Sequence, residues 1–337
     1  MSAYPAGAAA RDRFILDRRP ARATHDPWQT QGAIVEDERA ADGAIVRVAT
    51  VFLTGRECPW RCLMCDLWKY TTEGDTPRGA IPQQIAGARR TLADTAQTVD
   101  QIKLYNAGSF FDPRAVPEDD YGAIAETLAG CSRVIVESHP SLVGHRTSRF
   151  LDALRQAHPS DVALEVAMGL ETVHPEALAQ LNKRMDVDDF VRASERLKAL
   201  GVALRVFLLV FPPFVPDSEQ DEWLLRSVDV AFDAGATAVS LIPTRSGNGA
   251  LEALERNQFR QPRLADLERS FDAGLGRVPP GRGRLFADLW DLEAFADCRA
   301  CRDARRNRLR EMNLRQQRLP AITCAVCSTP PGPARPS

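Results

Sequence analysis

Short apolar segments alternate with segments of helical periodicity between residues 44 and 242. Apolar residues that recur near every 3.6 positions predict amphipathic helices, and the short continuous apolar runs between them predict buried strands. This alternation is typical of a parallel sheet with right-handed helical crossovers. The expected strands are 46–53, 101–105, 133–137, 163–168, 203–211 and 238–242.

The helical segments have residues at their ends that favour starting or stopping a helix. Pro82 suits a first helical turn, and Gly201 and Gly235 suit the position after a last turn. The expected helices are 81–95, 121–128, 148–156, 188–200, 219–234, 251–257 and 264–273.

Six strand–helix units are too few to close an eight-stranded barrel. We therefore expect an α/β fold with a partial (βα)6 TIM-like barrel over residues 44–257. Functional groups of such folds collect at the carboxyl ends of the strands.

The pattern changes on both sides of this region. Residues 1–43 form an N-terminal extension, and its first 22 residues mix Ala, Pro and Arg without the apolar core of a secretion signal. We expect those residues to be disordered or loosely docked. Residues 258–337 form a C-terminal extension with a Pro/Gly/Arg linker at 277–284 and one further strand at 285–289.

Composition narrows the classes of function. The formal net charge of -2 over 337 residues gives no whole-molecule attraction to nucleic acid or anionic lipid. No apolar run is long enough to cross a bilayer, so we expect a cytoplasmic protein without a membrane partner. Eight cysteines without a secretion signal favour metal ligation in a reducing compartment over a disulfide framework. Cys131 stands alone and is expected to be a small buried side chain.

The first cysteine group has CxxxCxxC spacing directly after the first expected strand. Cys58, Cys62 and Cys65 provide three thiolates, which can hold three irons of a 4Fe-4S cube and leave the fourth iron open. An open iron can bind a substrate or a cofactor. The alternative is a zinc site, which would need a fourth ligand that the nearby sequence does not offer.

Several segments together with this motif resemble the radical S-adenosylmethionine (SAM) superfamily. They are residues 57–68, 106–112, 137–140 and 169–172, and they are most similar to the branch that contains the elongator catalytic subunit, the tRNA methylthiotransferases and the archaeosine-synthase radical SAM subunit. Residues 181–185 and 242–245 most resemble the last group and its uncharacterised bacterial relatives.

The resemblance implies how SAM is bound: its amino and carboxylate groups chelate the open iron. The segment that receives the amine departs here from the usual Gly-Gly-Glu. The implied SAM contacts are Asn106, Gly108 and Ser109 for the amine, Glu137 for the amine or ribose, Glu171 as a second polar group, Arg184 for the carboxylate and Met64 for the adenine.

Other interpretations of these residues stay open. Glu171 and Arg184 could form a surface ion pair, and Met64 could be part of an ordinary core. His139 is the one histidine expected near the site, as a catalytic group or as a loop residue.

The resemblance also implies the chemistry. A reduced cluster cleaves SAM to methionine and a 5′-deoxyadenosyl radical, which abstracts hydrogen from a substrate, and the enzyme is oxygen-sensitive. The electron would come from a reductase or from a flavodoxin- or ferredoxin-type donor. The leading substrate is a modified tRNA base or nucleoside. The alternatives are tailoring of a natural product or small molecule, and a non-catalytic metal- or RNA-binding protein on the same fold.

The second cysteine group has the spacing CxxC-x22-CxxC. Cys298, Cys301, Cys324 and Cys327 match a four-thiolate metal site, which could hold zinc or a second 4Fe-4S cluster, with a metal-free thiol group as the third possibility. The segment between the pairs is rich in arginine. Its arginines could contact RNA phosphates or pack their stems on the barrel, and the absence of aromatic residues there weakens the RNA interpretation.

Overall fold

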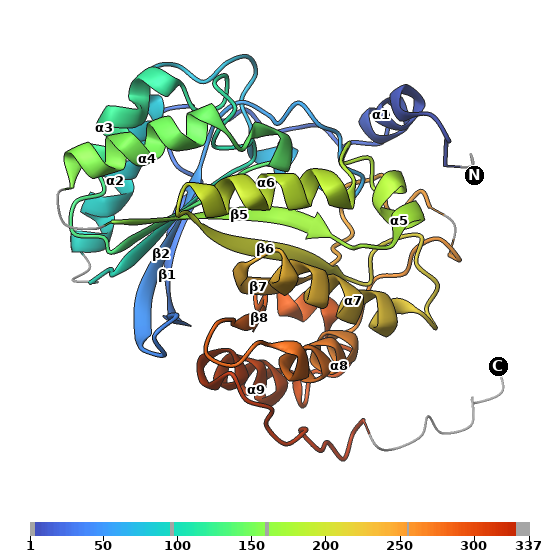
Figure 1. Ribbon diagram of the computed structural model, residues 1–337. Coiled ribbons are helices and arrows are strands. Elements are labelled where there is room, and N and C mark those ends of the chain that lie inside the picture. The colour runs from blue at the N-terminus through green and yellow to red at the C-terminus, as the bar shows by residue number, and fades with distance from the viewer. Residues whose placement is uncertain (1–3, 95–97, 159–161, 255, 328–337) are drawn as a thin grey trace.

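One sheet of eight strands forms the centre of the protein (Figure 1). The computed structural model describes residues 4–94, 98–158, 162–254 and 256–327. The strands follow one another across the sheet in chain order, with the first antiparallel to the second and all later neighbours parallel. They are β1 (Gly32–Arg39), β2 (Ile45–Leu53), β3 (Gln101–Asn106), β4 (Arg133–Glu137), β5 (Ala163–Glu171), β6 (Ala203–Val210), β7 (Ala236–Pro243) and β8 (Leu285–Ala287).

Helices cover the outer face of the curled sheet, so the expected partial barrel is confirmed (Figure 1). Alternate residues of each parallel strand, such as Val51, Val134 and Val166, are fully buried against these helices. The covering helices are α2 (Ala80–Asp94), α3 (Tyr121–Glu126), α4 (His145–Ala157), α6 (Val187–Ala199), α7 (Gln220–Asp233) and α8 (Leu264–Gly274). Gly201 and Gly235 follow α6 and α7 with positive φ, as their positions predicted.

Further helices lie outside this covering layer in the described ranges. They are α1 (Ala8–Leu16), α5 (Pro175–Gln180), α9 (Arg302–Arg315) and 3₁₀ helices at Leu67–Tyr70, Glu118–Asp120, Pro140–Leu142, Leu275–Arg277 and Leu292–Phe295. Within the described ranges, no helix has both the length and the apolar character required to cross a membrane.

The sheet extends beyond the region that the sequence assigned to the barrel. The six expected strands and the further strand near residue 285 are all present, but β1 was not expected. Charged residues occupy four of its eight positions, Glu36 to Arg39, so it lacks an apolar pattern. Because β1 lies in residues 1–43 and β8 in residues 258–337, hydrogen-bonded pairing links both extensions to the barrel. The division at 43/44 and 257/258 stays a prediction.

Two local expectations were wrong. Residues 251–254 form turns instead of a helix, because Asn248 Oδ1 accepts from the backbone N–H groups of Ala250 and Leu251. Residues 4–22 are also not loosely docked, while residues 1–3 lie outside the described ranges. In α1, Phe14 and Ile15 are buried.

Cys131 is buried, as expected.

Charged residues fill the amino-terminal end of the barrel interior. Arg205 Nη2 lies 2.5 Å from Glu38 Oε1, and Arg205 Nε lies 2.7 Å from Glu165 Oε1. Lys103 Nζ pairs with Glu38 at 2.6 Å and Arg133 with Glu165 at 3.2 Å. Burial alone would raise the pKa of Glu38, but Arg205 and Lys103 hold it well below its usual range. This network closes the end of the barrel opposite to the carboxyl ends of the strands.

The half-barrel leaves the edge of β8 without a further strand, and α9 takes that place. Ala287 N–H donates to Asn313 Oδ1 at 2.8 Å, and Asn313 Nδ2 donates back to Ala287 O at 2.9 Å. Gln316 forms the same two bonds with Leu285, at 2.7 and 2.8 Å. The two side-chain amides therefore satisfy backbone groups that a neighbouring strand would otherwise pair.

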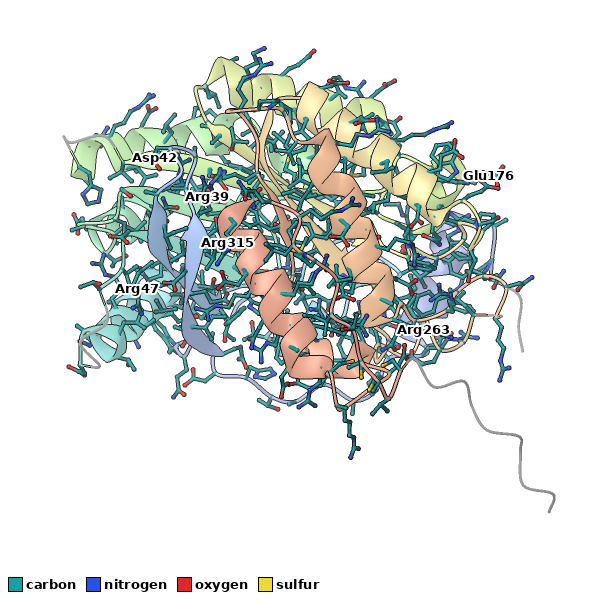
Figure 2. The ribbon with its side chains drawn as sticks, turned by 90° about the horizontal axis from the view of Figure 1, so that it is seen from below. Arg39, Asp42, Arg47, Glu176, Arg263 and Arg315 are labelled. Carbon is teal, nitrogen blue, oxygen red and sulfur yellow. The ribbon has the colours of Figure 1, made fainter. Side chains whose placement is uncertain are left out.

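The same helix also reaches the opposite edge of the sheet. Arg39 of β1 donates from Nη1 to Leu314 O of α9 at 3.1 Å, and Arg284 Nη1 donates to Arg39 O at 3.0 Å. Figure 2 shows α9 lying between the β1–β2 pair and α8, with Arg315 near Arg39. The arginine-rich segment thus packs on the barrel. Arg305 and Arg308, on the inner side of α9, pair with acidic residues of α8.

Removing one of these amides should loosen the edge of β8. We expect Asn313→Ala to lower the free energy of unfolding by about 1–2 kcal/mol, because both polar groups of Ala287 lose their partner. Urea unfolding followed by circular dichroism measures the change. Arg315→Ala, on the exposed side of α9, is the matched control and should change stability by less than about 0.5 kcal/mol. Equal effects of the two substitutions would contradict this role for Asn313.

Candidate functional site

The loop after β2 carries Cys58, Cys62 and Cys65 and is fixed from two neighbouring loops. Leu63 N–H donates to Leu181 O at 2.9 Å, and Asn182 Nδ2 donates to Arg61 O at 2.7 Å. Asn248, in the loop after β7, donates to Leu63 O at 2.6 Å. These bonds hold the backbone that presents the three thiols. Sequence reasoning missed both asparagines because their partners are backbone groups more than a hundred residues away.

The three thiols sit in a poorly solvated place. Burial raises the pKa of Cys58 to about 12 and that of Cys65 to about 11, and it raises the pKa of Cys62 well above its usual value. A metal that binds these sulfurs must therefore displace their protons. In chemical type, three thiolates from one loop fit the donor set for three irons of a 4Fe-4S cluster.

An aromatic stack joins this loop to the end of β4. The rings of Trp60 and His139 lie 3.8 Å apart and are nearly parallel, at 8°. His139 Nε2–H donates to Lys183 O at 2.9 Å, while Nδ1 accepts from Ser141 N–H at 3.2 Å. Burial and the charge of Lys183 lower the pKa of His139 to about 4, so the ring is neutral near pH 7. These contacts support the loop role of His139.

The last residue of β3 offers an unpaired amide to the site. Both Oδ1 and Nδ2 of Asn106 are buried without a hydrogen-bond partner among the described residues. A Cβ at Gly108 would lie only 2.8 Å from Arg56 O, so the backbone passes too close for a larger residue. Ser109 Oγ accepts from His139 N–H at 2.9 Å and holds the loops after β3 and β4 together. A buried amide without a partner is costly, so Asn106 fits a polar ligand at this position.

A buried ion pair lies at the end of β5. Lys183 Nζ and Glu171 Oε1 are 2.5 Å apart, and both side chains are about nine-tenths buried. Burial alone would lower the pKa of Lys183, but Glu171 and the nearby Cys62 raise it, so the ammonium keeps its charge. A Cβ at Gly169 would overlap both side-chain ends, so the ion pair can take this position only beside glycine or after shifting.

Arg184 points away from this ion pair. Its Nη2 pairs with Asp12 of α1 at 2.7 Å, and its side chain is 39% exposed. The ion pair between Glu171 and Arg184 that the sequence allowed is not formed. Asn182 and Arg184 both have positive φ, which turns the intervening Lys183 inward. The residue types in this loop do not reveal which side chains turn inward and which turn outward.

Glu137 ends β4 and faces the interior of the barrel. Burial raises the pKa of its carboxyl to about 8, Lys183 opposes that shift and Glu171 adds to it. The carboxyl is therefore mostly protonated at neutral pH and can donate as well as accept a hydrogen bond. Met64, in the cysteine loop, is half-buried and packs against the cluster of Phe14, Ile15 and Leu63. The assignment of these residues to SAM stays a prediction.

The N-terminal segment covers the outside of the cysteine loop. Arg19 pairs with Glu57 at 2.7 Å, directly before Cys58, and Arg22 Nη1 donates to Thr71 Oγ1 at 2.9 Å. His25 Nε2 lies 2.7 Å from Lys69 O. Sequence reasoning missed this role because the Ala/Pro/Arg mixture has little periodicity. The signal that was available is the pair of adjacent apolar residues at 14 and 15.

The raised pKa of Glu137 predicts a pH-dependent stability. Between the ordinary value of 4.5 and about 8, the folded protein keeps this proton while the unfolded chain loses it, so the free energy of unfolding falls as pH rises. We expect Glu137→Gln to stabilise the protein relative to the wild type, by at least about 1 kcal/mol more at about pH 8 than at about pH 5. Urea unfolding at both pH values measures this difference.

The control for this experiment is Glu176→Gln, on the exposed start of α5 (Figure 2). Its effect on stability should be the same at both pH values. A pH-independent effect of Glu137→Gln would show that the buried carboxyl does not hold its proton.

Comparisons with known proteins show relatives of this chain. The archaeosine synthase subunit beta of Methanosarcina acetivorans is 26% identical over 234 residues, which are 66% of this chain and 65% of that protein. The archaeosine synthase subunit beta of Thermococcus kodakarensis is 26% identical over 208 residues, 60% of this chain and 63% of that protein. The chain thus spans slightly less than two thirds of these relatives.

The solved structure of the Elp3 protein of Methanocaldococcus infernus superposes with a TM-score of 0.49 at 15% identity, covering 70% of this chain and 60% of that one. A family model described as the radical SAM superfamily matches residues 52–225, just over half of the 337 residues. The chain therefore belongs to the radical SAM superfamily.

Proposed function

We propose that this radical SAM enzyme modifies a base or nucleoside of tRNA. The observation that carries the enzymatic part is the nearness of Cys62, in the loop after β2, to the buried pair of Lys183 and Glu171. The unpaired amide of Asn106 ends the adjacent strand β3. The names of the two archaeosine synthase relatives support a tRNA-related substrate.

The residues of the site have distinct roles in this proposal. The three thiolates hold three irons of a 4Fe-4S cluster and leave one iron for SAM. Bound together, the cluster and SAM supply one-electron cleavage of SAM and removal of a hydrogen atom from an unreactive carbon. Asn106 and the protonated Glu137 offer hydrogen bonds to the amine and ribose. Lys183 supplies the positive charge for a carboxylate, in place of the outward-facing Arg184.

Further partners follow from this chemistry. Cleavage consumes one electron, which a reductase or a flavodoxin- or ferredoxin-type donor in the cytoplasm would supply. Both archaeosine synthase relatives are named as subunits, which favours a protein partner for this chain as well. The second candidate function is tailoring of a small molecule, which uses the same SAM chemistry without RNA.

The test of the enzymatic proposal is formation of 5′-deoxyadenosine. The protein is reconstituted with iron and sulfide without oxygen, then given dithionite and SAM, and the product is measured by chromatography and mass spectrometry. We expect product from the wild type and background from Cys62→Ala, because one iron loses its ligand. Product at background level from a wild type that holds about four irons would contradict the enzymatic proposal.

The tRNA substrate has its own test. A gel-shift assay with bulk tRNA at low salt should show binding that weakens as salt rises, since phosphate contacts release counterions. Turnover should increase with tRNA that lacks the modification. No binding even at low salt, with SAM cleavage intact, would favour the small-molecule alternative.

The role of Lys183 is tested by a matched pair of charge removals. The double substitution Lys183→Met with Glu171→Gln leaves no lone buried charge, and we expect it to weaken SAM binding at least about tenfold, the loss of one charged hydrogen bond. Arg184→Met should change SAM affinity by less than about twofold. Equilibrium dialysis on cluster-loaded protein measures both. If Arg184→Met weakened SAM binding more than the double substitution, Arg184 and not Lys183 would contact the SAM carboxylate.

A further inference from the structure

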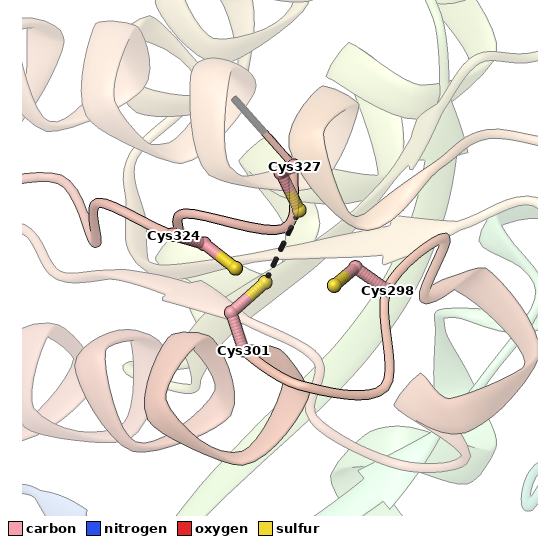
Figure 3. Close-up of side chains that lie close together, drawn as sticks. All are labelled: Cys298, Cys301, Cys324 and Cys327. Carbon is pink, nitrogen blue, oxygen red and sulfur yellow. Dashed lines mark hydrogen bonds between the residues drawn. The ribbon is translucent and has the colours of Figure 1, made fainter. Parts of the chain in front are cut away.

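Four cysteines outside the SAM site converge at the start of α9 (Figure 3). Cys298 and Cys301 precede the helix, with Cys301 as its N-cap residue, and Cys324 and Cys327 come from the segment that returns after it. All four sulfurs lie within 4.8 Å of one another, and those of Cys301 and Cys327 are 3.6 Å apart. Residues far apart in the chain thus present four ligand atoms to one point.

These separations indicate how many metal ions the four sulfurs can share. Two thiolates on one zinc ion, each with a bond of about 2.3 Å, are at most about 4.6 Å apart and about 3.8 Å apart in a regular tetrahedron. In a 4Fe-4S cluster each cysteine binds a different iron, so an iron–iron separation adds to the two bonds and spreads the sulfurs further. The observed limit of 4.8 Å lies close to the single-ion range, and it therefore favours one metal ion over a cluster.

We propose that these four cysteines bind one zinc ion in a closed tetrahedral site. Four thiolates leave no open coordination position, which is the arrangement of structural zinc sites. Four thiolates around a divalent ion carry two negative charges, and Arg305 of α9 lies against Cys301 while pairing with Glu268 at 2.5 Å. Zinc has no redox chemistry, which suits a site whose ligand Cys327 is exposed.

The position of the site gives the zinc a mechanical role. It ties the first turn of α9 to the returning segment, which runs back along the helix, where Arg308 donates from Nη2 to Leu319 O at 2.8 Å and to Asp272 of α8 at 2.7 Å. The same α9 supplies the amides of Asn313 and Gln316 to the edge of β8. The zinc therefore fixes the helix that covers the open side of the half-barrel.

Metal analysis separates the occupants. The triple substitution Cys58→Ala, Cys62→Ala and Cys65→Ala removes the ligands of the SAM site, and we expect about one zinc and no iron per chain, measured by mass spectrometry of the metals. Cys298→Ser with Cys301→Ser in the wild-type background should lose the zinc. Retention of about four irons in the triple variant, of one iron, or of no metal would overturn the proposal.

The mechanical role needs a readout that does not depend on SAM. Treatment of the folded wild type with a zinc chelator, and the substitution Cys327→Ser, should both speed amide hydrogen exchange in α9 and residues 317–323, at least about tenfold for a helix turn that opens locally. Cys131→Ser, which removes a buried thiol elsewhere, should keep the zinc and the slow exchange. Unchanged exchange in α9 after zinc loss would overturn the mechanical role. Because no step uses SAM, failure here leaves the proposed function untouched.

Discussion

An open sheet has two edges with unpaired backbone groups, and the rest of this structure depends on how they are covered. A closed barrel has no such edges, but a closed barrel also leaves less room at its mouth. Here α9 lies against both edges, with Asn313 on β8 and the backbone of Leu314 on β1. A single helix therefore pairs with backbone groups of the β8 edge and contacts the β1 edge, while the sheet itself remains open.

Charge is arranged in two layers inside the barrel, and burial gives them different properties. At the amino-terminal end, Arg205 satisfies two carboxylates, so the network is closed and rigid. At the other end, Asn106 has no partner among the described residues. Burial, with Glu171 nearby, outweighs the charge of Lys183 and raises the pKa of Glu137, so its carboxyl keeps a proton. Unsatisfied polar groups cost stability, and proteins retain them mainly where a ligand completes the network. The polar end is thus built for binding and the charged end for support.

Local sequence patterns predicted those parts of the fold whose structure depends mainly on nearby residues. The parallel strands have apolar runs because both faces of the sheet are buried. Gly201 and Gly235 follow amphipathic helical segments and adopt the positive φ that ends a helix. β1 was not predicted, because half of its residues are charged and gain their partners only from strands that are distant in the sequence. The inward position of Lys183 was not predicted for a related reason. The positive φ of Asn182 and Arg184 decides which side chain of this loop turns inward. The cysteine spacings were informative because metal chemistry limits them, whatever the surrounding fold.

The two cysteine groups differ in how the chain brings their cysteines together. The SAM-site cysteines come from one loop, so their geometry depends on the bonds that Asn182 and Asn248 make to that loop. The second group joins two segments that lie on either side of α9, so its geometry depends on the helix and in turn holds the helix in place. A reactive site needs an open position and a fixed backbone, whereas a structural site needs every position filled. Spacing along the chain thus separates the two groups: the compact motif suits the reactive site that we propose, and the paired motifs that span α9 suit the structural zinc site that we propose.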